Sequence, residues 1–172
     1  MPPSFEHVVI ELLNTTHDFE AFDCGDPSRD AWLKARALAN QVGDHTRTYA
    51  ALEGNIVRGF CALTTTAILR ETLPGKLRRN APDMVSGVLL AQLAVDRPWQ
   101  GQGLSKELVL HAMEKAVVIA GLAGTHLFVV HPATPALRGY YEKFGFTSVA
   151  TTPGPVMVMP MATVRKVLAL TA

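Results

Sequence analysis

Short apolar and alternating runs along the chain predict a series of β-strands. They span residues 6–13, 46–52, 57–66, 87–96, 125–131, 146–150 and 156–161. The second and third runs flank the turn signal Glu53-Gly54-Asn55, which favours a hairpin. The run 87–96 is nearly continuous, so it predicts a strand buried on both faces except at Gln92.

Apolar residues spaced three and four apart predict helices over 28–40 and 103–120, the second ending at Gly121. A third helix is expected to start at Thr134 and to end at Gly145. Segment 70–82 is polar, basic and interrupted by prolines, which predicts an exposed loop. Without repeats or linkers, this order indicates one α/β domain over residues 1–172.

Composition narrows the class of protein. With 48% hydrophobic and 18% charged residues, the chain is globular, and its net charge of +1 argues against a uniformly basic nucleic-acid binder. The N-terminal run does not resemble a secretory signal, and no apolar stretch is long enough for a membrane span, so we expect a cytoplasmic protein. Neither the two cysteines nor the six histidines have metal-ligand spacing, and no metal is expected.

The glycine-rich segment 100–105, QGQGLS, follows a buried strand and opens a helix. Such turns bind phosphates, because glycine allows close approach of the backbone and helix N–H groups point at the anion. A P-loop lysine is missing, and Lys106 stands where a dinucleotide fingerprint needs its third glycine. Taken alone, the segment is either a phosphate-binding turn of another kind or a simple turn.

Two motifs together resemble the GNAT N-acetyltransferase superfamily. QGQGLS resembles its R/Q-x-x-G-x-G/A turn, and YEKFGF at 141–146 resembles its Y-E-x-x-G-F element. The chain departs from the family at Ser105, usually glycine or alanine, and at Thr134, near a frequent asparagine. The resemblance covers roughly residues 8–161 and implies the GNAT fold, with a mixed, mostly antiparallel central sheet flanked by helices.

The same resemblance implies acetyl-CoA as cosubstrate. The strand backbone before the turn would pair with the pantetheine arm, and the N–H groups of the turn would hold the pyrophosphate. Gln100 would lie at the mouth of the turn. The residues so assigned are Leu93, Ala94, Val95, Gln100, Gly101, Gln102, Gly103, Leu104 and Ser105.

Tyr140 and Tyr141 share one side of the third helix, and their spacing alone would suit two core residues. The resemblance aligns Tyr141 with the family tyrosine that protonates the leaving thiolate, and leaves Tyr140 for packing. The strand 87–96 has no carboxylate where some family members keep a glutamate, and Gln92 cannot take up a proton at neutral pH. This favours an α-amine substrate: an α-amino group titrates at about 7.7–8.0, below a lysine side chain at about 10.4, and an esterified amino acid lower still, so such an amine is largely neutral without a strong base.

A narrower resemblance concerns the acceptor. Segments 22–28, FDCGDPS, and 93–101, LAVDRPWQG, look like those of GNAT toxins from type II toxin–antitoxin systems, although 22–28 also reads as a helix cap. The resemblance implies acetylation of aminoacyl-tRNA, inhibition of translation, a ribbon-helix-helix antitoxin and a homodimer. Candidate tRNA contacts are Lys34, Arg36, Lys76, Arg78 and Arg79. Two alternatives are a GNAT enzyme for a small-molecule amine and an inactive acyl-CoA-binding module.

Overall fold

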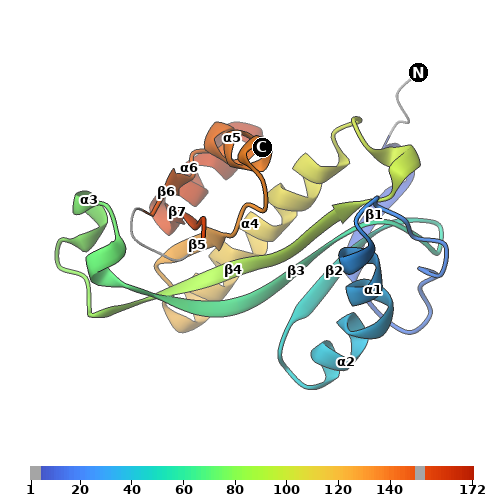
Figure 1. The fold of residues 1–172 in the computed structure, drawn as a ribbon, viewed down its shortest axis with the longest axis horizontal. Coiled ribbons are helices and arrows are strands. Elements are labelled where there is room, and N and C mark those ends of the chain that lie inside the picture. The colour runs from blue at the N-terminus through green and yellow to red at the C-terminus, as the bar shows by residue number, and fades with distance from the viewer. Residues whose placement is uncertain (1–4, 150–153) are drawn as a thin grey trace. The chain divides into compact units, whose positions relative to one another are not determined.

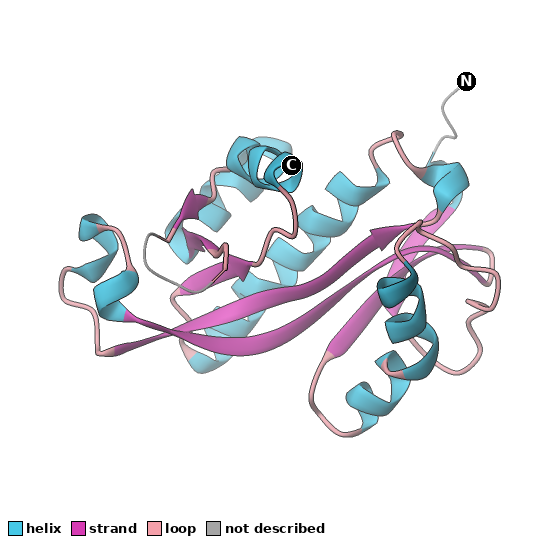
Figure 2. Ribbon diagram, viewed as in Figure 1, coloured by secondary structure: helices cyan, strands magenta, loops and turns pink. Residues whose placement is uncertain are grey.

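The structure is a computed structural model that describes residues 5–149 and 154–172. A seven-stranded sheet has the order β1-β2-β3-β4-β5-β7-β6, accompanied by helices (Figures 1 and 2). Strands β4 and β5 are parallel, whereas β1–β2, β2–β3, β5–β7 and β6–β7 are antiparallel. The predicted fold class, α/β with a mixed and mostly antiparallel sheet, is confirmed.

The chain folds into two compact units, and both β3 (Ile56–Leu69) and β4 (Met84–Val95) run through the two. The first unit contains the described residues up to Thr64 together with Ala91–Ala112. The second contains Thr65–Leu90 and the described residues from Met113 onward.

In the first unit, β1 (Val8–Leu12) pairs with β2 (Arg47–Glu53), which pairs with β3 in the predicted hairpin. A 3-10 turn, Phe5–His7, replaces the expected start of β1. The predicted helix 28–40 is divided at Arg36 into α1 (Pro27–Ala35) and α2 (Ala37–Val42). Apolar side chains of both helices pack into one core with β2 and β3. The buried members of this core are Leu13, Phe22, Leu33, Ala37, Ala50, Leu52, Val57, Phe60 and Ala94.

In the second unit, β5 (Leu127–Val130) runs parallel to the first half of β4, and β7 (Met157–Pro160) lies between β5 and β6 (Thr147–Ser148). Helix α5 (Pro135–Phe144) begins and ends as predicted, with Thr134 as N-cap and left-handed Gly145 as C-cap. Two further helices are α3 (Gly75–Arg78) and α6 (Met161–Thr171). Helix α4 (Leu104–Ala123) begins in the first unit and ends in the second.

Several sequence predictions are wrong in detail. Segment 70–82 is not a loop but contains a 3-10 turn (Arg70–Thr72) and α3, because Leu73, Leu77 and Ala81 pack on the core around Val85. The last strand ends at Pro160, and α6, which was not predicted, follows at once.

Helix and strand ends also differ. Helix α4 continues past Gly121 to a left-handed Gly124. Strand 87–96 starts earlier, at Met84, and is half-exposed at Leu89 and over 91–93 rather than at Gln92 alone. Of the predicted strand 146–150, Thr147 and Ser148 are β, and Ala150 lies outside the described residues. No helix of the described ranges has the length and apolar character that a membrane span requires.

Candidate functional site

The glycine turn of the first unit connects a 3-10 turn (Arg97–Trp99) to α4. Gly101 (φ 74°) and Gly103 (φ 93°) are both left-handed, a conformation that side-chain-bearing residues rarely adopt. A Cβ at Gly101 would meet nothing within 4 Å, so that side of the turn is open. The N-terminal N–H groups of a helix lack intrahelical partners and attract anions. The turn therefore has the geometry that a phosphate-binding turn requires, and its binding of the pyrophosphate stays a prediction.

Gln100 does not point freely at the mouth of this turn. Its Nε2 donates to two carbonyl oxygens, that of Cys24 at 2.8 Å and that of Val95 at 2.9 Å. It thereby connects the segment before α1 to the end of β4. The side chain of Gln100 consequently anchors the start of the turn to these two segments. Within the turn, Gln102 Nε2 donates to the carbonyl of Pro98 at 3.0 Å.

Asp23 and Asp96 strengthen the same connection. Asp96 Oδ1 accepts from the Asp23 N–H at 3.1 Å, and Arg97 donates its backbone N–H to the Asp23 carbonyl (2.9 Å) and its Nε to Asp23 Oδ1 (3.1 Å). Together with Cys24 and Gln100 these residues form what we call the turn-anchoring network. Sequence reasoning did not predict it, although it contains Asp23, Asp96 and Arg97 of the toxin-like segments FDCGDPS and LAVDRPWQG.

Charge is compensated within this network. Asp96 is buried, and its Oδ2 receives the Nη1 of Arg58 at 3.2 Å. Hydrogen bonds from Gly25 N–H and, secondly, from Arg97 hold the pKa of Asp23 below its ordinary value. Arg58 also lies over the Trp99 ring, 5.7 Å from its centroid. Asp23 is therefore ionised at neutral pH and can keep its contacts there.

Strand β4 continues for five residues, Ala91–Val95, beyond Leu90, the last residue that pairs with β5 in the described part of the chain. This region contains the predicted pantetheine contacts Leu93, Ala94 and Val95. The carbonyl of Leu93 accepts from Nη1 of Arg29 at 3.0 Å, and the carbonyl of Val95 accepts from Gln100. Arg29 belongs to α1, which begins within the toxin-like segment 22–28, so this helix contacts the end of β4 through the Arg29 side chain.

Tyr141 belongs to the second unit, near the C-terminal end of α5, and is 6% exposed. Its ring contacts Phe146 edge-on at 5.5 Å and Tyr140 at 5.4 Å. The Phe146 N–H bonds to the Tyr141 carbonyl at 3.3 Å, which left-handed Gly145 makes possible. Tyr140 is half-exposed and also packs edge-on against Phe144 at 5.2 Å. The helix cap thus holds Tyr141 firmly in its place.

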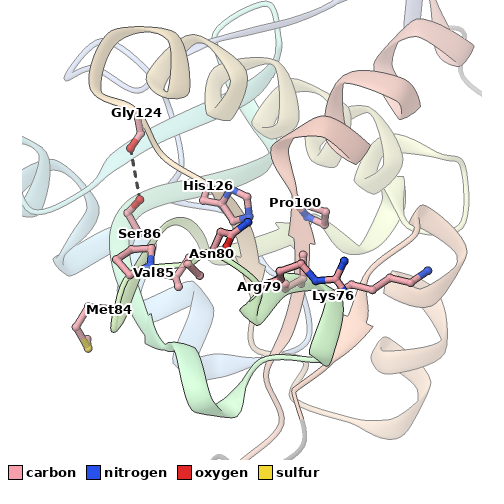
Figure 3. A pocket seen from close by; sticks show the side chains of 12 residues that line it. Lys76, Arg79, Asn80, Met84, Val85, Ser86, Gly124, His126 and Pro160 are labelled. Atoms are coloured by element: carbon pink, nitrogen blue, oxygen red, sulfur yellow. Dashed lines mark hydrogen bonds between the residues drawn. The ribbon is translucent and has the colours of Figure 1, made fainter.

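The predicted tRNA contacts come from both units. Lys76 and Arg79 line a pocket of about 430 Å³ in the second unit (Figure 3), whereas exposed Arg78 does not line it. Lys34 and Arg36 belong to the first unit, on α1 and at the residue that follows it. His126, which the sequence did not single out, also lines the pocket. Within the described ranges, no three His, Cys, Asp or Glu side chains are grouped to hold a metal ion.

The fold and the glycine turn define an α/β protein with a strand–turn–helix junction of the kind that binds phosphate groups. The family model of the acetyltransferase (GNAT) domain matches residues 44–148. A curated relative, the tRNA-acetylating toxin of Mycobacterium tuberculosis, is 35% identical over 147 residues, covering 86% of this chain and 89% of that protein. The chain therefore belongs to the GNAT acetyltransferase family.

Solved structures agree on the fold. A mutant of KacT superimposes with a TM-score of 0.88 at 22% identity, covering 94% of this chain and 99% of that one. AtaT complexed with acetyl-methionyl-tRNAfMet superimposes with a TM-score of 0.87 at 24% identity, covering 96% and 99%. AtaT has also been solved bound to the C-terminus of the antitoxin AtaR and acetyl-CoA, with a TM-score of 0.80 at 21% identity over 94% and 98% of the chains.

Proposed function

We propose that this protein is a toxin that transfers the acetyl group of acetyl-CoA to the α-amine of aminoacyl-tRNA and so blocks translation. The observation that carries the donor half is the turn at the N-terminus of α4, which is left-handed at Gly101 and Gly103 and open at Gly101. The acceptor half is supported by the 35% identity to a tRNA-acetylating toxin over most of both chains.

The donor residues act mainly through their backbone. The turn from Gly101 to Ser105 holds the pyrophosphate through N–H groups and the helix dipole. The end of β4, over Leu93–Val95, pairs with the pantetheine arm as an added strand, since no β5 residue of the described chain pairs there. Acetyl-CoA supplies an acetyl group activated as a thioester.

Tyr141 supplies the proton. Attack of the amine nitrogen on the acetyl carbon breaks the carbon–sulfur bond, and the Tyr141 phenol protonates the departing sulfur. The α-amine is largely neutral near pH 8, so it attacks without a strong base, and a water molecule takes its surplus proton. The chain then needs no carboxylate beside Gln92 on β4.

The partners follow from this function. Lys34, Arg36, Lys76, Arg78 and Arg79 meet tRNA phosphates, and their exposure suits that contact. A ribbon-helix-helix antitoxin neutralises the enzyme, which is a homodimer. Because charged tRNA is its substrate, the protein acts in the cytoplasm.

The deciding experiment supplies labelled acetyl-CoA with charged tRNA, uncharged tRNA and a panel of small amines. We expect label on charged tRNA alone, at the amino acid. Tyr141→Phe should lower kcat by about 100-fold or more with little change in KM for acetyl-CoA. Tyr140→Phe, the matched control, removes a neighbouring hydroxyl and should stay within about twofold.

Growth of a bacterium expressing each variant gives an independent readout. The wild type and Tyr140→Phe should arrest growth, and Tyr141→Phe should not. Labelling of a small amine but not of charged tRNA would identify the protein as a small-molecule acetyltransferase. Acetyl-CoA binding without any labelling would identify an inactive acyl-CoA-binding module.

A further inference from the structure

The pocket lined by Lys76 and Arg79 lies at the beginning of β4, at the opposite end of that strand from the glycine turn in sequence. Its walls come from α3 and the residues that follow it, from the start of β4, from Gly124 and His126 before β5, and from Pro160 at the end of β7 (Figure 3). A volume of about 430 Å³ is in the range of small-ligand sites.

The pocket is cationic. Lys76, Arg79 and His126 line it, and none of its lining residues in the described chain is Asp or Glu. The acid of the adjoining loop, Asp83, is already paired with Arg70 Nη2 at 2.8 Å. A ligand with negative charge is therefore favoured over a cationic amine.

The cations are mounted on a packed support. Leu77 and Ala81 pack against the core cluster that contains buried Val85, and Arg70 Nη1 donates to the Ala81 carbonyl at 3.0 Å. Asn80 is left-handed (φ 59°), which turns the chain between Arg79 and Ala81. Because these contacts fix the backbone, the pocket is formed before any ligand arrives.

The lining is not only charged. Val85, Met84 and Pro160 provide apolar surface, and Ser86 and Asn80 provide polar groups. A bare inorganic anion would leave the apolar part unused. A nucleotide uses both parts, with its phosphate at the cations and its base against the His126 ring and the apolar side chains.

We propose that this pocket binds one unpaired nucleotide of an RNA chain, with Lys76 and Arg79 pairing with its phosphate. The inference rests on the proposed function for the identity of the RNA, which is tRNA. It adds a defined subsite to what would otherwise be diffuse electrostatic attraction.

The test measures binding of uncharged tRNA by filter retention over a series of salt concentrations, without acetyl donor. The variant K76Q/R79Q should lower affinity about tenfold and reduce the slope of log K against log salt by about 0.7 or more, the value for one single-strand phosphate. The control R165Q/K166Q removes two equally exposed cations of α6 and should leave the slope unchanged.

A second variant separates a pocket from a charged surface. Ser86→Phe fills the pocket from β4 and keeps all the cations, so it should weaken tRNA binding about fivefold or more without changing the salt slope appreciably. K76Q/R79Q and Ser86→Phe are first compared with the wild type by thermal unfolding. Unchanged tRNA affinity in a folded Ser86→Phe protein would overturn the pocket and leave only surface charge.

Further arms separate this proposal from the proposed function. If charged tRNA is acetylated but K76Q/R79Q binds tRNA like the wild type, the pocket is refuted and the function stands. If charged tRNA is not acetylated, the function fails, and the binding data still decide whether the pocket takes RNA. Binding of free CMP or AMP with loss in K76Q/R79Q, without an effect on tRNA, would assign the pocket to free nucleotides and refute the RNA subsite. An acidic peptide that alone depends on these residues would refute it as well.

Discussion

Removing the Gln100 side chain tests whether the turn-anchoring network serves the donor site. The amide of Gln100 makes two hydrogen bonds, of 2.8 Å and 2.9 Å, to the carbonyls of Cys24 and Val95. Gln100→Ala abolishes both and touches neither the backbone of Gly101 nor that of Gly103. It therefore weakens the anchor without removing any group proposed to contact the pyrophosphate.

The size of the effect follows from these two bonds. Each hydrogen bond between neutral groups contributes about 0.5–1.5 kcal/mol net, so the anchored form of the turn loses about 1–3 kcal/mol. A ligand that binds only the anchored form has its apparent Kd divided by the anchored fraction. The contacts of Asp23 with Asp96 and Arg97 remain, so we expect a rise of about three- to tenfold in KM for acetyl-CoA.

The assay compares two donors. Acetyl-CoA has the pyrophosphate that the turn is proposed to hold, and S-acetylpantetheine lacks it. Gln100→Ala should raise KM for acetyl-CoA, leave kcat within about twofold and raise KM for S-acetylpantetheine much less, because only its bond to the Val95 carbonyl reaches the strand proposed to pair with the pantetheine arm. This split distinguishes a positioning role from a general loss of structure, which would impair both donors.

Gln41→Ala is the matched control. Gln41 also bridges backbone groups, because its Nε2 donates to the Leu13 carbonyl at 2.7 Å and its Oε1 accepts from the Thr48 N–H at 3.0 Å. Its loss should lower the melting temperature about as much as Gln100→Ala does and leave KM for acetyl-CoA unchanged. Equal KM values for the wild type and Gln100→Ala, or equal losses with both donors, would refute the reasoning.

Two other predictions concern stability and thiol chemistry. Gly145→Ala places a side chain at φ 108° and should lower the free energy of unfolding by about 1–2 kcal/mol. Gly121→Ala, inside α4 with open space around it, should raise that free energy by about 0.5–1 kcal/mol. Denaturant unfolding measures both, and an unchanged stability of Gly145→Ala would contradict the strained cap. Burial and the Asp30 carboxylate raise the pKa of Cys24 to about 11, so its alkylation by iodoacetamide at pH 8 should be about 100-fold slower than in the unfolded chain. Burial raises the pKa of Cys61 to about 12, and Cys61 should react only after unfolding. Mass spectrometry measures both reactions, and rapid labelling of either cysteine in the folded protein would contradict this prediction.

The sequence was most informative where one local signal determines one local structure. Thr134, Pro135 and Gly145 mark both ends of α5 through a side-chain cap, a fixed φ and a left-handed residue, and the structure has these ends as predicted. Gly121 was chosen as a helix end on the same logic and is wrong. Leu122 continues the helix and Gly124 offers another left-handed position, so composition alone could not decide between two glycines three residues apart.

The prediction of a loop over segment 70–82 is wrong for a different reason. Its charges and prolines are on the surface, as expected of a loop, but Leu73, Leu77 and Ala81 recur at a spacing of four and bury one side of the segment. For α6, apolar residues spaced three and four apart, Met161, Val164 and Leu168, were available in the same way. In both places a short apolar stripe outweighs unfavourable neighbours because packing, rather than propensity, supplies most of the stability of a short helix.

The candidate site divides in the same manner. The glycine turn and Tyr141 can be selected from the sequence only through the resemblance of QGQGLS and YEKFGF to two GNAT motifs, because spacing alone suits a simple turn and two core tyrosines equally well. The anchoring network could not, since it joins Asp23 to Asp96 and Cys24 to Gln100 across more than 70 residues, and only the folded chain brings those groups within 3.1 Å. Segment 22–28 resembles the GNAT toxins in sequence and also has the pattern of a helix N-cap. Its contacts supply a physical reason for the pattern: Asp26 caps α1, whereas Asp23 and the Cys24 carbonyl hold the turn. Under the proposed function these contacts support the donor side of the reaction, so residues that select the acceptor are to be sought elsewhere, with the Lys76–Arg79 pocket the first to test.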